Sequence, residues 1–185
     1  MNWNNHSDLK DLHAFLSPSS YHWLNYTPEK LETTYRTSKM KEEGTVLHAF
    51  ASMAIIKRIK LANIKKALNQ FVNDSIGFKM ESEKVLFYSP NIFGTADAIS
   101  FKDNVLRIFD LKTGVTKPSF KQLDIYAALF CLEYGVDPTT ISIEERLYQG
   151  NGFEVNIPES LWIQDIMNKI VELDMVLDNI KQTSR

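Results

Sequence analysis

Two aspartates and a lysine lie at the ends of two adjacent segments that have the residue pattern of β-strands. The stretch GTADAISFKDNVLRIFDLK contains two alternating apolar runs separated by Asp103 and Asn104, a pair typical of a tight hairpin turn. Pairing outward from a two-residue turn places Asp97 opposite Asp110, and side-chain alternation places Lys112 on the same face. The sequence therefore predicts an apolar strand face that ends in two facing carboxylates.

Facing carboxylates point to a divalent metal ion. Residues paired across a sheet lie about 4.5–5.5 Å apart, and two carboxylates there are stable if a cation bridges them or one is protonated. Mg²⁺ prefers oxygen ligands and is often held by one or two carboxylates together with substrate phosphate. Lys112 would then orient or deprotonate a water molecule, or stabilise charge on a phosphoryl group. The alternative is an exposed hairpin end with an Asp–Lys ion pair.

Other polar residues are candidates to complete this site. His48 flanks a predicted apolar helix stripe, where it is either a metal ligand or a structural histidine. Gln122 and Tyr126 are four residues apart and share one face of a predicted helix; the alternatives are a capping box for Gln122 and a core position for Tyr126. Glu81 and Glu83 lie at a strand start, where solvation near a turn is the simpler expectation.

Other reaction classes lack the residues that they need. The single cysteine, Cys131, lies in an apolar helical run, and no serine lies in a GxSxG turn. One cysteine also excludes an internal disulfide framework, a cysteine-ligated iron–sulfur cluster and a multi-cysteine zinc site. Because GxxxxGK and GxGxxG segments are missing, nucleotide-dependent classes are unsupported.

The composition is that of an ordinary globular protein. Of 185 residues, 44% are hydrophobic and 24% charged, and the formal net charge of −2 gives no global basic field for nucleic acid. A local basic cluster is either a solvated helix face or a nucleic-acid contact. It consists of Lys57, Arg58, Lys60, Lys65 and Lys66. The N-terminal residues lack a signal-peptide pattern and no apolar run has the length of a membrane span, which predicts a cytoplasmic protein without a membrane partner.

The predicted elements are helices, three strands, a helix, a strand and a final helix. The strands are expected at residues 81–88, 92–101, 105–111 and 141–148. A first helix is expected to start at Ser17, and a second at Lys41, with a further helical run through Phe71. A third is expected over 119–134, where Ser119 caps its start and Gly135 ends it. A last helix with an apolar stripe is expected from Pro158. Residues 28–41 are charged without clear periodicity and are expected to form a loop or a mobile flap.

This order predicts an α/β or α+β fold with a small mixed sheet of about four strands flanked by helices. The length fits a single domain, residues 1–185. Within it we expect an N-terminal arm and flap over 1–40, a catalytic core over 41–150 and a C-terminal helix over 158–183.

Four short motifs carry a resemblance to a known family. They are Glu43-Gly44-Thr45-x-x-His48, Gly94-Thr95-Ala96-Asp97, Asp110-Leu111-Lys112-Thr113-Gly114 and Gln122-Leu123-x-x-Tyr126-Ala127. In this order they resemble the RecB-type exonuclease branch of the PD-(D/E)XK nuclease superfamily, and the upstream segments SPSSYHWLNY and EEGT are similar to small phage-type members. The resemblance runs from about His48 to Ala127 and implies a restriction-endonuclease-like core.

The resemblance implies a role for each motif residue. The ligands of Mg²⁺ or Mn²⁺ would be His48, Asp97, Asp110 and the backbone carbonyl of Leu111. Lys112 would be catalytic, and Gln122 and Tyr126 would organise the site and the substrate. Ala96 stands where the family name has proline. The iron–sulfur cysteines of some relatives are missing, so no cluster is expected.

The resemblance favours a metal-dependent DNA nuclease, and within that class an exonuclease that hydrolyses phosphodiester bonds of linear DNA in recombination or repair. The alternatives are an endonuclease of the same fold, a nuclease-derived DNA-binding module without catalysis, and a phosphate-binding or structural protein that uses the cation for stability. The expected partner is DNA. A recombination or single-strand-binding protein and a second copy of the chain are further candidates, and a phage-type origin would place the protein in a bacterial cytoplasm.

Overall fold

The computed structural model describes residues 15–16, 24–114 and 117–183. The chain divides into two compact units, residues 1–43 and residues 44–185, and the second contains every predicted site residue. The predicted helix start at Ser17 and Pro18 lies outside the described residues.

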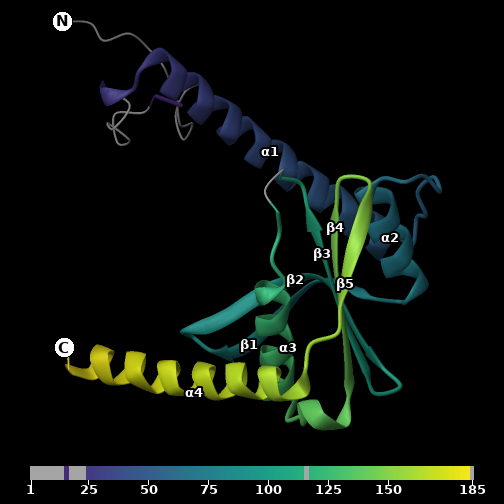
Figure 1. Cartoon of the computed structure of the whole chain (residues 1–185), viewed down its shortest axis with the longest axis vertical. Helices are drawn as coiled ribbons and strands as arrows, with labels where there is room; N and C mark the ends of the chain where they lie inside the picture. Colours follow the sequence, from purple (N-terminus) through teal and green to yellow (C-terminus); the bar gives the residue numbers. More distant parts are fainter. Residues whose placement is uncertain (1–14, 17–23, 115–116, 184–185) are drawn as a thin grey trace, which may run out of the picture. The chain divides into compact units, whose positions relative to one another are not determined.

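Five strands of the second unit form one sheet in the order β1-β2-β3-β4-β5 (Figure 1). They are β1 (Glu81–Ser89), β2 (Ile92–Lys102), β3 (Val105–Lys112), β4 (Ser142–Gln149) and β5 (Gly152–Asn156). Neighbouring strands are antiparallel except for β3 and β4, which are parallel and joined through helix α3 (Lys121–Tyr134) and a 3₁₀ turn (Pro138–Thr140). A parallel pair needs such a crossover. The predicted class, a mixed sheet flanked by helices, is confirmed.

The sheet has one strand more than the predicted four, namely β5. A two-residue turn joins it to β4, because Gln149 pairs with Gly152 and Gly150 has φ 62°. The turn sequence Gly150-Asn151 and the alternating Phe153 and Val155 that follow it are the signal for this hairpin. Five residues are a short run, so the pattern is easy to miss between a strand and a helix.

Residues 28–41 are not a loop or flap but belong to helix α1 (Pro28–Ile56), and that prediction is wrong. The Lys30 N–H donates to Thr27 Oγ1 at 3.2 Å, and an ion pair of 2.6 Å joins Arg36 to Glu32 one turn earlier. Capping, helix-forming residues and i,i+4 pairs support a helix here without an apolar stripe. Apolar periodicity was therefore the wrong criterion for this segment.

The two faces of the sheet have separate cores. Side chains such as Ile99, Ile108 and Leu147 pack on one face with α3 and α4 (Ser160–Thr183). Phe109 and Tyr148 pack on the other face with α2 (Ala67–Gly77) and with the residues of α1 nearest its C-terminal end. In Figure 1 α2 and α3 accordingly lie on opposite sides of the strands.

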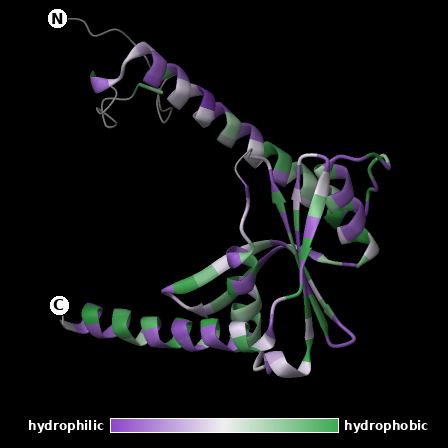
Figure 2. Cartoon of the chain, in the orientation of Figure 1, coloured by the Kyte–Doolittle hydropathy of each residue, from purple (hydrophilic) through white to green (hydrophobic). Residues whose placement is uncertain are grey.

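Helix α4 begins two residues after Pro158, as predicted, but only part of its apolar stripe is buried. Ile163 and Ile170 are buried against the core, whereas Leu173 and Ile180 are about half exposed, and apolar residues continue along the helix in Figure 2. Within the described part of the chain no helix has both the length and the apolar character needed to cross a membrane.

Candidate functional site

The β2–β3 hairpin has the predicted two-residue turn. Asp103 and Asn104 have φ values of 52° and 57°, as a type I′ turn requires, and the ladder runs outward from Lys102–Val105. Its last pair is Ala98–Phe109, so the expected ladder pair of Asp97 with Asp110 does not form. Instead, Asp97 Oδ2 accepts the Leu111 N–H at 2.9 Å, which ties the Asp97 carboxylate to the backbone of β3.

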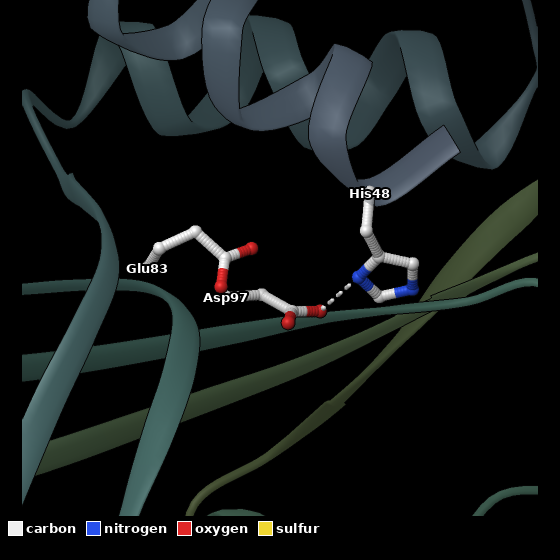
Figure 3. A group of neighbouring side chains, drawn as sticks. All are labelled: His48, Glu83 and Asp97. Carbon is white, nitrogen blue, oxygen red and sulfur yellow. Dashed lines mark ion pairs between the residues drawn. The ribbon is translucent and has the colours of Figure 1, made fainter. Parts of the chain in front are cut away.

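A distortion in β1 brings Glu83 to the same place. Ser82 pairs with Ala98 and Lys84 with Ala96, which leaves Glu83 unpaired in the ladder at the level of Asp97, with φ 53°. Positive φ is uncommon for a residue other than glycine, and such outliers gather at functional sites. Glu83 is exposed, and its side chain is directed toward Asp97 (Figure 3). Solvation near a turn was the simpler expectation for Glu83, with a further carboxylate for the site as the alternative.

His48 projects from α1 toward the same aspartate (Figure 3). Its Nδ1 lies 3.3 Å from Asp97 Oδ2. One potential ligand atom each of His48, Glu83 and Asp97 lies within 4.8 Å of the other two. Helix α1 and the β1–β2 hairpin therefore bring a nitrogen and two carboxylates close together.

Asp110 and Lys112 lie at the end of β3. Lys112 Nζ is 2.9 Å from Asp110 Oδ2 and donates a hydrogen bond to Oδ1 at 3.1 Å. Asp110 is only 4% exposed, and the Lys112 ammonium lies close to both of its carboxylate oxygens. A buried carboxylate is costly unless a cation faces it, and Lys112 supplies that charge.

Helix α3 holds the lysine from the other side. Lys112 Nζ donates to Gln122 Oε1 at 2.8 Å, Gln122 Nε2 donates to the Tyr126 hydroxyl at 3.2 Å, and that hydroxyl donates to the Thr95 carbonyl at 2.6 Å. The capping-box alternative for Gln122 is therefore wrong. Phe120 is the N-cap of α3 and has no side-chain cap bond, while Ser119 Oγ only accepts the Lys121 N–H at 3.3 Å.

Two motif glycines are explained by close approach. An added Cβ at Gly94 would lie 2.9 Å from Tyr126 Cε1, so a larger residue would displace the ring that supports Gln122. An added Cβ at Gly44 would lie 2.6 Å from Thr113 Oγ1, where α1 passes the end of β3. Glycine at these two positions lets the elements that carry His48 and Tyr126 pack against the hairpin.

The carboxylates and the histidine perturb one another's protonation. The hydrogen bond to Asp97 raises the pKa of His48, partly offset by burial. Burial raises the pKa of Asp110 and of Glu83, and the negative charge of Asp97 adds to both shifts. Burial is thus the first cause of the two carboxyl shifts, and repulsion from Asp97 adds to it, so a nearby cation would favour the ionised carboxylates.

We call His48, Glu83, Asp97, Asp110 and Lys112 the candidate site. Its donor set fits a hard divalent cation, because His48, Glu83 and Asp97 bring an imidazole and two carboxylates within 4.8 Å of one another, and the Asp110 carboxylate lies near enough to interact with Asp97. A bound cation would relieve the repulsion between carboxylates. The geometry brings together the predicted ligands His48 and Asp97 and adds Glu83; the role of the Leu111 carbonyl stays a prediction.

The predicted basic cluster lies beyond the end of α1 rather than on a helix face. Its five residues are exposed along the connection between α1 and α2. Lys57 also lines a groove that contains His48 and Glu83. The basic cluster thus begins beside the candidate site.

Comparison of the chain with protein-family models, with curated proteins and with solved structures gave no match. Functional inference therefore depends on the motifs and on the geometry of the candidate site.

Proposed function

We propose that the protein is a metal-dependent deoxyribonuclease, specifically an exonuclease that hydrolyses phosphodiester bonds of linear DNA in recombination or repair. The observation that supports this most strongly is the convergence of four sequence motifs. His48, Asp97, Asp110 with Lys112, and Gln122 with Tyr126 come from four separate segments and are linked by short contacts. The proposal includes membership of the RecB-type PD-(D/E)XK nucleases.

His48, Asp97 and Asp110 would hold Mg²⁺ or Mn²⁺, with the Leu111 carbonyl as a further ligand and Glu83 close enough to contribute. When bound, the cation supplies a Lewis acid for the phosphodiester and lowers the pKa of water. The Leu111 N–H fixes one oxygen of Asp97, and Lys112 fixes one oxygen of Asp110. Both carboxylates are thus oriented by the chain itself. No iron–sulfur cluster is part of the proposal.

Lys112 is placed to act on the reacting phosphate. Its ammonium has three N–H donors, of which Asp110 and Gln122 take two. The third can orient the attacking water or stabilise charge on the phosphoryl oxygens while the water oxygen adds to phosphorus and the bond to the leaving ester oxygen breaks. Gln122 and Tyr126 are positioning residues, because they act through Lys112 and the Thr95 carbonyl.

The test is cleavage of end-labelled linear duplex, single-stranded and closed circular DNA by the full chain with Mg²⁺ or Mn²⁺, beside a chelator control. We expect metal-dependent degradation of linear DNA and none of closed circles. Lys112→Ala should abolish cleavage. The matched control is Lys102→Ala, which removes an exposed lysine that also pairs with an aspartate, 3.8 Å away on the same hairpin.

Two results would change this proposal. If no DNA substrate is cleaved with either metal, the chain is not a nuclease, and a DNA-binding module without catalysis becomes the better account. Cleavage of closed circles would instead identify an endonuclease.

A further inference from the structure

A groove opens beside the candidate site, along the side of α1 that carries His48. Its volume is about 530 Å³, and its lining includes His48 and Glu83 together with Ala49, Met53 and Ile56. Met53 and Ile56 are 46% and 68% exposed, so the groove presents apolar side chains to solvent. Exposed apolar surface next to a polar site commonly marks a binding site.

The groove has a cation at a defined distance from the candidate site. Lys57 lines it and directly follows Ile56, the last residue of α1, which is eight positions after His48 and so about 12 Å farther along a helix that rises 1.5 Å per residue. Neighbouring phosphates of one DNA strand are only about 3.4 Å apart along the axis of a duplex. The groove is therefore long enough for a strand that contacts both the candidate site and Lys57.

The charge at the Lys57 end of the groove favours an anionic occupant, whereas Glu83 makes the end at the candidate site acidic. Lys57 is exposed and is followed by Arg58 and, after Ile59, by Lys60 in the connection to α2. Cationic side chains in such a row neutralise phosphates and give salt-dependent binding. An apolar occupant without charge would leave this row unused.

The apolar lining favours an unpaired strand over a duplex. In a duplex the faces of the bases are stacked on one another, and the outside offers mostly phosphate and sugar. In a single strand the base faces are free to pack on side chains while the backbone follows basic residues. The combination of Ala49, Met53 and Ile56 with Lys57 matches the second case.

We propose that this groove holds a single DNA strand, with unpaired bases against Met53 and Ile56 and the backbone between the candidate site and Lys57. This inference rests on the proposed nuclease function and specifies its substrate: the enzyme acts on single-stranded or frayed ends in preference to blunt duplex.

The test uses fluorescence anisotropy with a labelled oligothymidylate, an abasic strand of the same length and a blunt duplex. Binding is measured with Mg²⁺ on full chains that carry Lys112→Ala, so that no strand is cut. Met53→Asp places a carboxylate in the groove. Val46→Asp places one on the same helix outside the groove lining, at a side chain that is 65% exposed.

We expect Met53→Asp to weaken oligothymidylate binding about tenfold, because the bound strand would cover the new carboxylate with its bases and phosphates. Val46→Asp should change it less than about twofold, as expected for an exposed site. The chain that carries Lys112→Ala alone should bind the abasic strand more weakly than oligothymidylate. The chain that also carries Met53→Asp should bind the two strands equally. Lys57→Ala should reduce the slope of log affinity against log salt by about 1.

The groove assignment is overturned if Met53→Asp and Val46→Asp bind oligothymidylate equally, or if the blunt duplex binds more tightly than the single strand. The proposed function is tested separately, because it requires metal-dependent cleavage by the unmodified chain. Cleavage with no effect of Met53→Asp on binding would retain the nuclease and reject the groove. If oligothymidylate binding depends on Met53 but the unmodified chain cleaves no DNA, the groove is retained as a strand-binding site and the nuclease function is rejected.

Discussion

Two clusters of carboxyl groups lie against helix α3, and they differ in what surrounds them. The candidate site has Lys112 and His48 as cationic partners and opens to a groove. The second cluster consists of Asp124 on α3 and Glu145 on β4, which are 5% and 0% exposed. We call it the buried carboxyl pair. Each cluster gathers acidic groups, but only the first offers charge compensation and access.

Neutral donors satisfy one oxygen of each residue in the buried carboxyl pair. Asn156 Nδ2 donates to Glu145 Oε2 at 2.8 Å, and Trp162 Nε1 donates to Asp124 Oδ2 at 3.0 Å. The remaining oxygens, Glu145 Oε1 and Asp124 Oδ1, receive no donor from other described side chains. Because Asp124 interacts with Glu145, a proton on Glu145 would let the two carboxyl groups share a hydrogen bond. Burial foremost, together with Asp124, raises the pKa of Glu145 to about 8.

Because the two clusters differ in this way, proximity of carboxylates does not by itself indicate a metal site. Where water and cations are excluded, one carboxyl group keeps its proton and the pair becomes a structural contact among α3, β4, β5 and α4. Where a lysine, a histidine and a groove are present, the groups stay available to a cation and a substrate.

The largest expected effect separates the two clusters by activity. Asp110→Asn should reduce metal-dependent DNA cleavage about 10²–10³-fold, because it removes a ligand charge and the partner of Lys112. Asp124→Asn, the matched change in the buried carboxyl pair, should leave the cleavage rate of the folded protein within about threefold. Initial rates on linear DNA measure both. Equal losses would mean that the comparison is mistaken.

The next effect is a pH dependence of stability that belongs to the buried carboxyl pair. Because the folded-state pKa of Glu145 is raised from 4.5 to about 8, the folded protein retains a proton that the unfolded chain loses in this range. The free energy of unfolding should fall by about 1.4 kcal/mol per pH unit between these values, on the order of 5 kcal/mol in all, and level off above them.

Urea unfolding from about pH 5 to about pH 8 measures this slope. Glu145→Gln should remove most of it, whereas Glu154→Gln, at an exposed carboxylate on β5, should retain it. An unchanged slope in Glu145→Gln would show that the proton is held elsewhere.

Replacing Glu83 should raise the stability of the protein and lower its affinity for a metal ion. Its φ of 53° is natural for glycine, so Glu83→Gly should raise the free energy of unfolding by about 1 kcal/mol. The same change removes a carboxylate from the candidate site and should weaken Mn²⁺ binding. Glu81→Gly, on the same strand without positive φ, is the control and should destabilise the protein. If Glu83→Gly lowers the free energy of unfolding as much as Glu81→Gly does, the backbone of Glu83 carries no strain.

The smallest effect concerns the support of Lys112. Tyr126→Phe removes the hydroxyl that links Gln122 to the Thr95 carbonyl, at a cost of about 0.5–1.5 kcal/mol in the free energy of unfolding. We expect a reduced kcat with little change in KM, because substrate contacts remain. Tyr134→Phe, at an exposed ring on the same helix, should change neither. A rise in KM alone would indicate that Tyr126 contacts DNA directly.

The parts of this molecule that were predictable from sequence depend on local pattern. Alternation and the Asp103-Asn104 turn were enough to place Asp97 and Asp110 at one end of the β2–β3 hairpin, and glycine marked the end of α3. The first turns of α1 were missed because they depend on capping and ion pairs rather than on apolar spacing.

The parts that were not predictable depend on tertiary contacts. The role of Glu83 requires the distortion of β1, and the bond from Leu111 to Asp97 requires the end of the ladder. Asp124 and Glu145 are far apart in the chain and belong to no motif. Their contact could therefore be found only from the structure.

The most direct test of the account is Mn²⁺ binding to the full chain, measured by titration calorimetry at neutral pH. The account predicts binding to the unmodified chain that is lost in Asp97→Asn and retained in Asp124→Asn. Absence of Mn²⁺ binding to the unmodified chain, or equal binding by both variants, would contradict it.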